Sequence, residues 1–160
     1  MDPMKIQQFA VITIAVATAL LSSPEICRAS DSSAAIAVVH AAGAAFNRGD
    51  LKAFAALCDS PAYVIDDFAP HQWDGPDACT NWANALTANM KQNGIANGVV
   101  VFGEPWHAAV TGNIAYVVVP ATLTYTQKGK PVKEAGSVWT LVLRKTANGW
   151  RITSWAWAQH

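Results

Sequence analysis

One aspartate in the sequence occupies a position where a carboxylate could carry out acid–base chemistry. Residues 62–68 are rich in β-branched and aromatic side chains, which is typical of a strand. Because side chains alternate along a strand, Asp66 shares a face with Val64, whereas Asp67 lies on the opposite face. A carboxylate against an apolar face can accept and return a proton, since burial tunes its pKa. The simpler alternative is a carboxylate at a strand end that only accepts backbone hydrogen bonds.

Two histidines, His71 and His107, could also act as acids or bases, because the ordinary pKa of histidine lies near neutral pH. For both we favour the simpler alternative, which is a surface histidine in a loop and a sheet histidine with a local partner. Together with Asp66 they could gather a metal ion, but no ligand spacing specifies one, so no metal site is predicted. The sequence has no nucleotide-binding loop and no HExxH motif, and we expect no cofactor.

Four of the seven tryptophans fall into a pattern that could build a binding pocket. Trp139 shares a strand face with Leu141, and Trp155 shares a face of the last strand with Trp157. Trp82 lies on an expected helix. Aromatic side chains placed in this way can line a cavity for a flat apolar molecule, or they can simply fill a core. Their spacing leaves both possibilities open.

The elements that must position these residues follow from apolar spacing and turn residues. A first helix capped at residues 31–33 ends near Asn47, a short second helix begins after Asp50, and a third extends from Pro76 to Asn93. After a loop at 69–75, strands are expected at 99–102, 106–110, 114–126, 132–145 (broken by Gly136) and 150–158. Helices gathered on one side of an antiparallel sheet form an α+β domain.

The charge balance of the chain bears on its partners. A length of 160 residues suggests one domain, and the 11 basic and 11 acidic side chains cancel. With no basic stripe to oppose phosphate groups, we expect no nucleic-acid partner.

The N-terminal residues 1–29 resemble a secretory signal peptide. Lys5 precedes an apolar run at 9–21 that is too short to span a membrane, and Cys27-Arg28-Ala29 resembles a cleavage site. We therefore expect a single mature domain over 30–160 with no membrane span and a secreted or periplasmic location. The alternative is a lipoprotein attached at Cys27.

Cleavage at this point would leave two cysteines, Cys58 and Cys79, in an oxidising compartment. A disulfide between them would close a loop of about 20 residues and stabilise the fold. The alternative is a pair of buried thiols that pack as small apolar groups. The sequence leaves both alternatives open.

Several short motifs occur in a recognisable order. The first helix ends in FNRGDL at 46–51, the strand segment AYVIDD follows at 62–67, Gly75 precedes the third helix, and the chain ends in NGWRITSW at 148–155. Together these motifs resemble the NTF2-like superfamily, with its SnoaL-like and ketosteroid-isomerase-like members. The resemblance covers about residues 32–158.

This resemblance implies an α+β cone in which three N-terminal helices pack on a strongly bent antiparallel sheet around an apolar pocket. It places Asp66 at the position of the general base in the ketosteroid-isomerase branch. Residues that it turns toward the pocket are Trp82, Trp139, Leu141, Trp155 and Trp157, with His71 and Trp73 near the mouth and His107 on a strand. It also implies frequent homodimers through the outer sheet face, to which Trp150, Ile152, Ser154 and Ala156 would contribute.

The chain departs from this family where enolate chemistry needs hydrogen-bond donors. Ala42 and about Leu141 stand where the ketosteroid-isomerase branch has a tyrosine and a protonated carboxylic acid. About Ala156 stands where SnoaL-like proteins often have a histidine. We therefore do not expect steroid isomerisation.

Two functions follow from these residues. In the first, an exported domain binds a small hydrophobic molecule in a Trp-lined pocket, with isomerase- or lyase-type proton transfer by Asp66. The alternative is a non-catalytic dimeric association module, or a structural module with a filled cone. The family contains both catalytic and non-catalytic members, so the fold does not decide between them.

Overall fold

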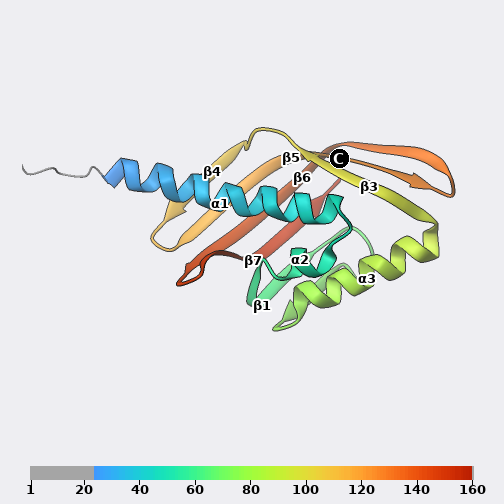
Figure 1. The fold of residues 1–160 in the computed structure, drawn as a ribbon, viewed down its shortest axis with the longest axis horizontal. Coiled ribbons are helices and arrows are strands. Elements are labelled where there is room, and N and C mark those ends of the chain that lie inside the picture. Colours follow the sequence, from blue (N-terminus) through green and yellow to red (C-terminus); the bar gives the residue numbers. More distant parts are fainter. Residues whose placement is uncertain (1–23, 160) are drawn as a thin grey trace, which may run out of the picture.

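In the computed structural model, which describes residues 24–159, three helices lie against one seven-stranded sheet (Figure 1). The helices are α1 (Pro24–Asn47), α2 (Leu51–Ala55) and α3 (Ala78–Asn93). The strands are β1 (Cys58–Ile65), β2 (Gln72–Gly75), β3 (Ile95–Phe102), β4 (His107–Thr111), β5 (Ile114–Gln127), β6 (Lys130–Thr146) and β7 (Gly149–Ala158). The predicted α+β architecture is confirmed.

The order of strands across the sheet is β2-β1-β7-β6-β5-β3, and β4 also pairs with β5. The pair β1–β7 is parallel, so the sheet is mixed rather than wholly antiparallel. The hairpin of β5 and β6 is long and extends beyond β7 toward the end of α3 (Figure 1).

The helix α1 packs its small side chains on the sheet. Ala35, Val39, Ala42 and Ala45 are fully or almost fully buried along one side of it. Gly43 lies so close to β3 that a Cβ atom added there would be 2.5 Å from a ring carbon of Phe102. The small residue therefore sets the distance between the helix and the sheet.

Several elements differ from their predicted extents. The strand β1 spans Cys58–Ile65 rather than 62–68, and β3 begins at Ile95 rather than at residue 99. The helix α1 begins at Pro24 rather than at a cap among residues 31–33, and residues 72–75 form the strand β2 instead of a loop. In β2, Trp73 pairs with Val64 of β1 and is buried against Phe68. This pairing gives the short segment its structure, and nothing in its local sequence indicates it.

A β-bulge in β6 changes which side chains face the inside of the sheet. Ser137 pairs with Ala121 and Ala135 pairs with Thr122, so Gly136 is an extra residue, with a φ of 83°. Glycine adopts this conformation without steric cost. Because of the extra residue, Glu134 rather than Ala135 lies opposite Leu123 of β5.

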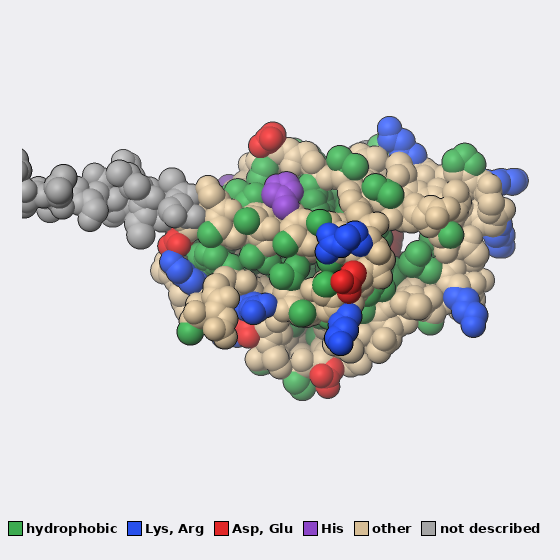
Figure 2. All heavy atoms as spheres, in the orientation of Figure 1, with side chains coloured by type: hydrophobic (Ala, Val, Ile, Leu, Met, Phe, Trp, Pro, Cys, Tyr) green, Lys and Arg blue, Asp and Glu red, His purple; other side chains and the backbone are tan. Residues whose placement is uncertain are grey.

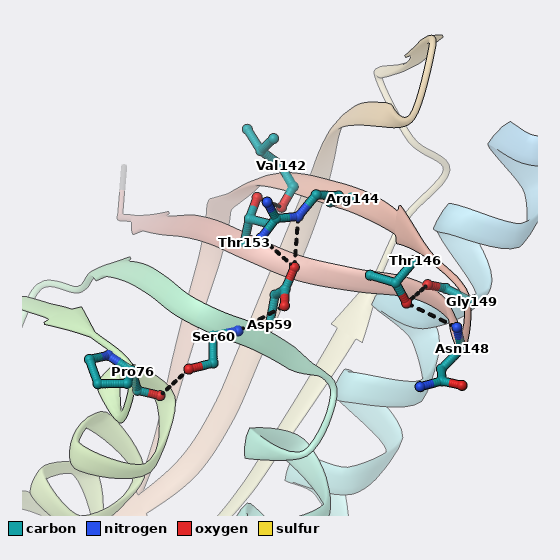
Figure 3. A network of polar contacts seen from close by, with 9 residues as sticks. All are labelled: Asp59, Ser60, Pro76, Val142, Arg144, Thr146, Asn148, Gly149 and Thr153. Carbon is teal, nitrogen blue, oxygen red and sulfur yellow. Dashed lines mark hydrogen bonds and ion pairs between the residues drawn. The ribbon is translucent and has the colours of Figure 1, made fainter.

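A second bulge, at Thr153 in β7, corrects the predicted outer face of the last strand. Val142 pairs with Ser154 and Leu143 with Ile152, which leaves Thr153 without a partner residue; its hydroxyl donates to the Val142 carbonyl at 3.1 Å (Figure 3). Simple alternation predicted Trp150 and Ile152 on the outer face. That was wrong, because the bulge reverses the faces and both side chains are buried.

Two covalent or ionic contacts hold β1 in place. Cys58 at the start of β1 forms a disulfide with Cys79 in α3, which settles the open question about the two cysteines. Closing a loop of this length stabilises a fold by about 3 kcal/mol. Next to it, the Arg144 guanidinium of β6 pairs with Asp59 at 2.6 Å (Figure 3).

The N-terminal predictions concern a part of the chain that the structure covers only in part. Lys5 and the apolar run at 9–21 lie outside the described residues. In residues 24–159 no helix is both long and apolar enough to cross a membrane.

Candidate functional site

The sheet and the helices enclose a cavity of about 470 Å³. Its walls come from the end of α1, from α2, from most of the length of α3, from the turn after β1, and from β3, β7 and the β5–β6 hairpin. The molecular surface is hollowed at the end of the molecule where α3 meets β3 (Figure 2). A volume of this size is typical of sites for small molecules.

Aromatic side chains form much of the wall. Trp82 and Trp155 meet edge to face with ring centroids 4.8 Å apart, and Trp139 approaches Trp155 at 5.8 Å. Phe102 stacks on Trp139 at 5.4 Å, and Phe54 contacts Trp82. This chain of ring contacts leaves a rigid apolar wall rather than a filled interior.

Asp66 lies in this wall, one residue beyond the end of β1, and only 9% of it is exposed. Its Oδ2 atom accepts a hydrogen bond from the indole N–H of Trp82 at 2.7 Å. Its Oδ1 atom accepts from the backbone N–H of Asp67 at 2.8 Å. Its own backbone N–H donates to the carbonyl of His71, which closes a turn and fixes the position of the carboxyl group.

Burial raises the pKa of Asp66 to about 7. The hydrogen bond from Trp82 opposes this shift, and the neighbouring Asp67 carboxylate adds to it. A carboxyl group with such a pKa holds and releases a proton near neutral pH, as a general base or acid must. Enzymes raise the pKa of a catalytic carboxyl group in the same way, by placing it in an apolar environment.

A second polar group lies on the hairpin side of the cavity. The hydroxyl of Tyr125 donates to Glu134 Oε1 at 2.7 Å, and Glu134 Oε2 is buried without a hydrogen-bond partner. The bond to Glu134, together with burial and the charges of Glu134 and Asp67, raises the pKa of Tyr125 to about 12. Tyr125 therefore stays protonated and holds the carboxylate in one orientation.

The structure brings five of the residues selected from the sequence into one cavity wall: Asp66, Trp82, Trp139, Trp155 and Trp157. Leu141 is fully buried in the core behind this wall, and Trp73 is buried between β1 and Phe68. Neither of these two lines the cavity.

The two histidines also lie away from the cavity wall. His71 is exposed in the turn after Asp66, and its ring nitrogen Nδ1 is 3.2 Å from the Asp66 carbonyl oxygen. His107 lies on the outer face of the sheet, where its ring contacts Tyr116. Across residues 24–159, no group of three or more His, Cys, Asp or Glu side chains is arranged to hold a metal ion.

Sequence reasoning missed the polar residues of the hairpin and of α3. Tyr125 follows Leu123 at the spacing of one strand face, so alternation could have indicated it. Glu134 could not be found in that way, because the bulge at Gly136 changes its face. Asn89 and Asn93, near the end of α3, complete the rim.

The family of this chain is shown by a match between its sequence and a family model. A model of the SnoaL-like domain matches residues 36–157, so the chain belongs to the SnoaL-like domain family. Several solved structures with a similar fold are named as NTF2-like proteins. No curated protein matches the sequence.

Three solved structures illustrate the shared fold. A variant of Rv3472, a protein of unknown function from Mycobacterium tuberculosis, has a TM-score of 0.72 and 14% identity over 88% of this chain and 78% of that one. A ketosteroid isomerase-like protein from Erwinia carotovora atroseptica has a TM-score of 0.65 and 19% identity, over 81% and 95%. A type 2 hexachlorocyclohexane dehydrochlorinase has a TM-score of 0.68 and 11% identity, over 81% and 85%. Such identities establish the fold alone.

Proposed function

We propose that this protein binds a small hydrophobic molecule in the Trp-lined cavity and that Asp66 exchanges a proton with it in an isomerase- or lyase-type reaction. The observation that carries this proposal is the carboxyl group of Asp66, buried in an apolar wall, oriented by two hydrogen bonds, and with a pKa of about 7. The names of two neighbours, an isomerase-like protein and a dehydrochlorinase, describe reactions in which a proton leaves carbon.

Proton removal creates negative charge on the ligand, and that charge needs a donor. The two positions expected to supply one in this fold carry Ala42 and Leu141, which are fully buried and apolar. Trp155 lines the cavity, but its indole N–H, which has no hydrogen-bond partner, is shielded from solvent and does not reach a ligand in this arrangement. Without donors at these positions an oxyanion is poorly stabilised, which favours substrates whose carbanion is already delocalised.

The test begins with a thermal-shift screen of flat apolar compounds against the wild type and Asp66→Asn. A ligand at 100 times its dissociation constant stabilises the fold by about 2.7 kcal/mol. We expect compounds that stabilise both proteins and that only the wild type converts, with loss of at least 100-fold in turnover for the variant. Full turnover by Asp66→Asn would refute the catalytic role, and no binding by any compound would refute the binding site.

The alternative is a non-catalytic association module, which the outer face of the sheet favours. Val101, Trp106 and Tyr116 expose 62%, 65% and 43% of their surface. These side chains belong to β3, to the segment before β4 and to β5, and they could pair with a second copy of the chain. Sedimentation velocity at micromolar concentration would test this, since we expect a homodimer.

We also propose that the protein is exported. The signal-like residues 1–29 motivate this proposal, and the disulfide Cys58–Cys79 supports it because disulfides persist in oxidising compartments. Recovery of a protein that begins near residue 30 from a secreted or periplasmic fraction would agree with it. A full-length N-terminus in the cytoplasm would refute it.

A further inference from the structure

The ionisable side chains that line the cavity are almost all of one sign. Asp66, Asp67 and Glu134 contribute three carboxyl groups, whereas none of the described lining residues is a Lys, Arg or His. Negative charge that no cation balances raises the pKa of neighbouring acids. The influence of Asp67 on both Asp66 and Tyr125, beyond the larger effects of burial and hydrogen bonding, agrees with this imbalance.

The three carboxyl groups are not equally available to a ligand. Each oxygen of Asp66 accepts one hydrogen bond, from Trp82 or from the backbone of Asp67, and the remaining lone pairs serve the proton exchange of the proposed function. The side chain of Asp67 is exposed, so water screens its charge. Glu134 differs from both, because its Oε2 atom is shielded from solvent and lacks a partner.

The fold holds Glu134 in this place by two devices. The bulge at Gly136 turns the side chain inward, opposite Leu123. The hydroxyl of Tyr125 then fixes Oε1, and the second oxygen has neither a hydrogen-bond partner nor exposure to solvent. A negative charge held at a fixed place in the lining acts on the cavity at short range, and a positively charged ligand would balance it.

The aromatic wall also favours a positively charged ligand. The face of an indole ring carries negative electrostatic potential and attracts cations, and tryptophan does so more strongly than the other aromatic residues. Trp139, Trp155 and Trp157 all line the cavity. The carboxylates and the indole rings of the lining therefore both favour a positively charged ligand.

We propose that the ligand of this cavity is a flat organic cation, attracted by the negative charge of Glu134 and by the indole rings of the wall. This proposal rests on the proposed function, since it takes the cavity as the binding site and names the class of its ligand. Asp66 then exchanges a proton with a carbon near the charged nitrogen, where the cation itself stabilises the carbanion. A cationic substrate thus reduces the need for the donors that are missing at Ala42 and Leu141.

The experiment compares two probes of the same shape and different charge, 1-methylquinolinium and 1-methylnaphthalene, by isothermal titration calorimetry. We expect the wild type to bind the quinolinium ion at least tenfold more tightly. Equal affinities, or tighter binding of the naphthalene, would overturn the cation proposal and leave the binding site intact. Binding of neither probe would overturn both this proposal and the proposed function.

A variant and its control test whether Glu134 is the source of the expected preference for a cation. Glu134→Gln keeps the shape of the side chain, and we expect it to reduce quinolinium affinity about tenfold with no change for the naphthalene. The control is Asp74→Asn, which removes one negative charge from an exposed residue of β2 outside the cavity and is expected to alter neither affinity.

A second variant keeps the proposal testable if Glu134→Gln does not fold. Should circular dichroism show that Glu134→Gln is unfolded, Asp67→Asn tests the same field from an exposed position, with a loss of two- to fivefold expected for the quinolinium ion alone. Full retention of the preference in whichever of these variants is folded would overturn the proposal.

Discussion

At the scale of single residues, the molecule concentrates its unusual chemistry in Asp66. The folded protein raises the pKa of this carboxyl from 3.8 to about 7, chiefly by burying it. The folded state therefore binds a proton more strongly than the unfolded state does. The free energy that this binding contributes is fully present below about pH 4 and is lost as the pH rises through 7.

The stability of the wild type should consequently fall, relative to Asp66→Asn, as the pH rises from 5 to 8. We expect a relative loss of about 2 kcal/mol, because each unit of pKa difference corresponds to about 1.4 kcal/mol. Urea unfolding of both proteins across this range measures it. A difference in unfolding free energy that stays constant from pH 5 to 8 would contradict the raised pKa.

The hydrogen bond from Trp82 lowers the pKa of Asp66 and so opposes the effect of burial. Removing this bond should show its contribution. In Trp82→Phe a smaller aromatic ring replaces the indole and the N–H is lost, so the pKa of Asp66 should rise further. Carboxyl carbon chemical shifts followed by NMR during a pH titration measure the change. Trp139→Phe is the control, because Trp139 makes no hydrogen bond to Asp66; a downward shift in Trp82→Phe would contradict the assignment.

At the scale of elements, the contact between α1 and β3 determines the shape of the cavity wall. Gly43 lets Phe102 approach the helix, and Phe102 stacks on Trp139 inside the cavity. The ring of Phe102 has little room to move, since it is held between the helix and the indole. A methyl group on the helix would therefore displace the wall as well as the helix.

Gly43→Ala should destabilise the protein by about 1–2 kcal/mol, although alanine favours a helix by about 1 kcal/mol over glycine. Thermal and urea unfolding measure the net effect. Ala44→Gly, at an exposed position of the same helix, reports the helix propensity alone. An increase in stability in Gly43→Ala would mean that Phe102 moves aside freely.

At the scale of the whole molecule, the outer face of the sheet determines whether the protein is a monomer or the proposed homodimer. Val101→Lys places a charge among the exposed apolar side chains of that face. We expect the proposed homodimer to dissociate into monomers with the cavity unaffected. Sedimentation velocity and probe binding together measure this, and a dimer that persists in Val101→Lys would place the interface elsewhere.

The order of helices and strands could be predicted because it depends on local patterns. The apolar spacing of α1 and α3 and the turn at Gly94 all lie within a few residues of the elements they define. The strand β2 could not be predicted, since Trp73 gains its structure by pairing with Val64. For the site, the same local alternation identified Asp66, Trp155 and Trp157.

The remainder of the site depends on irregular strand pairing. The bulge at Thr153 buries Trp150 and Ile152, and the bulge at Gly136 turns Glu134 inward. A bulge depends on how two strands pair, and one strand's sequence does not contain that information.

The bulge at Gly136 also has a consequence for how such a protein could diverge. Lys133 and Glu134 are neighbours, so they point to opposite faces of β6, and the position of the bulge alone selects between them. In a descendant without the bulge, Ala135 and Lys133 would lie opposite Leu123 and Tyr125. An ancestral preference for cations could thus become a preference for anions although every residue of the hairpin lining kept its identity except the glycine.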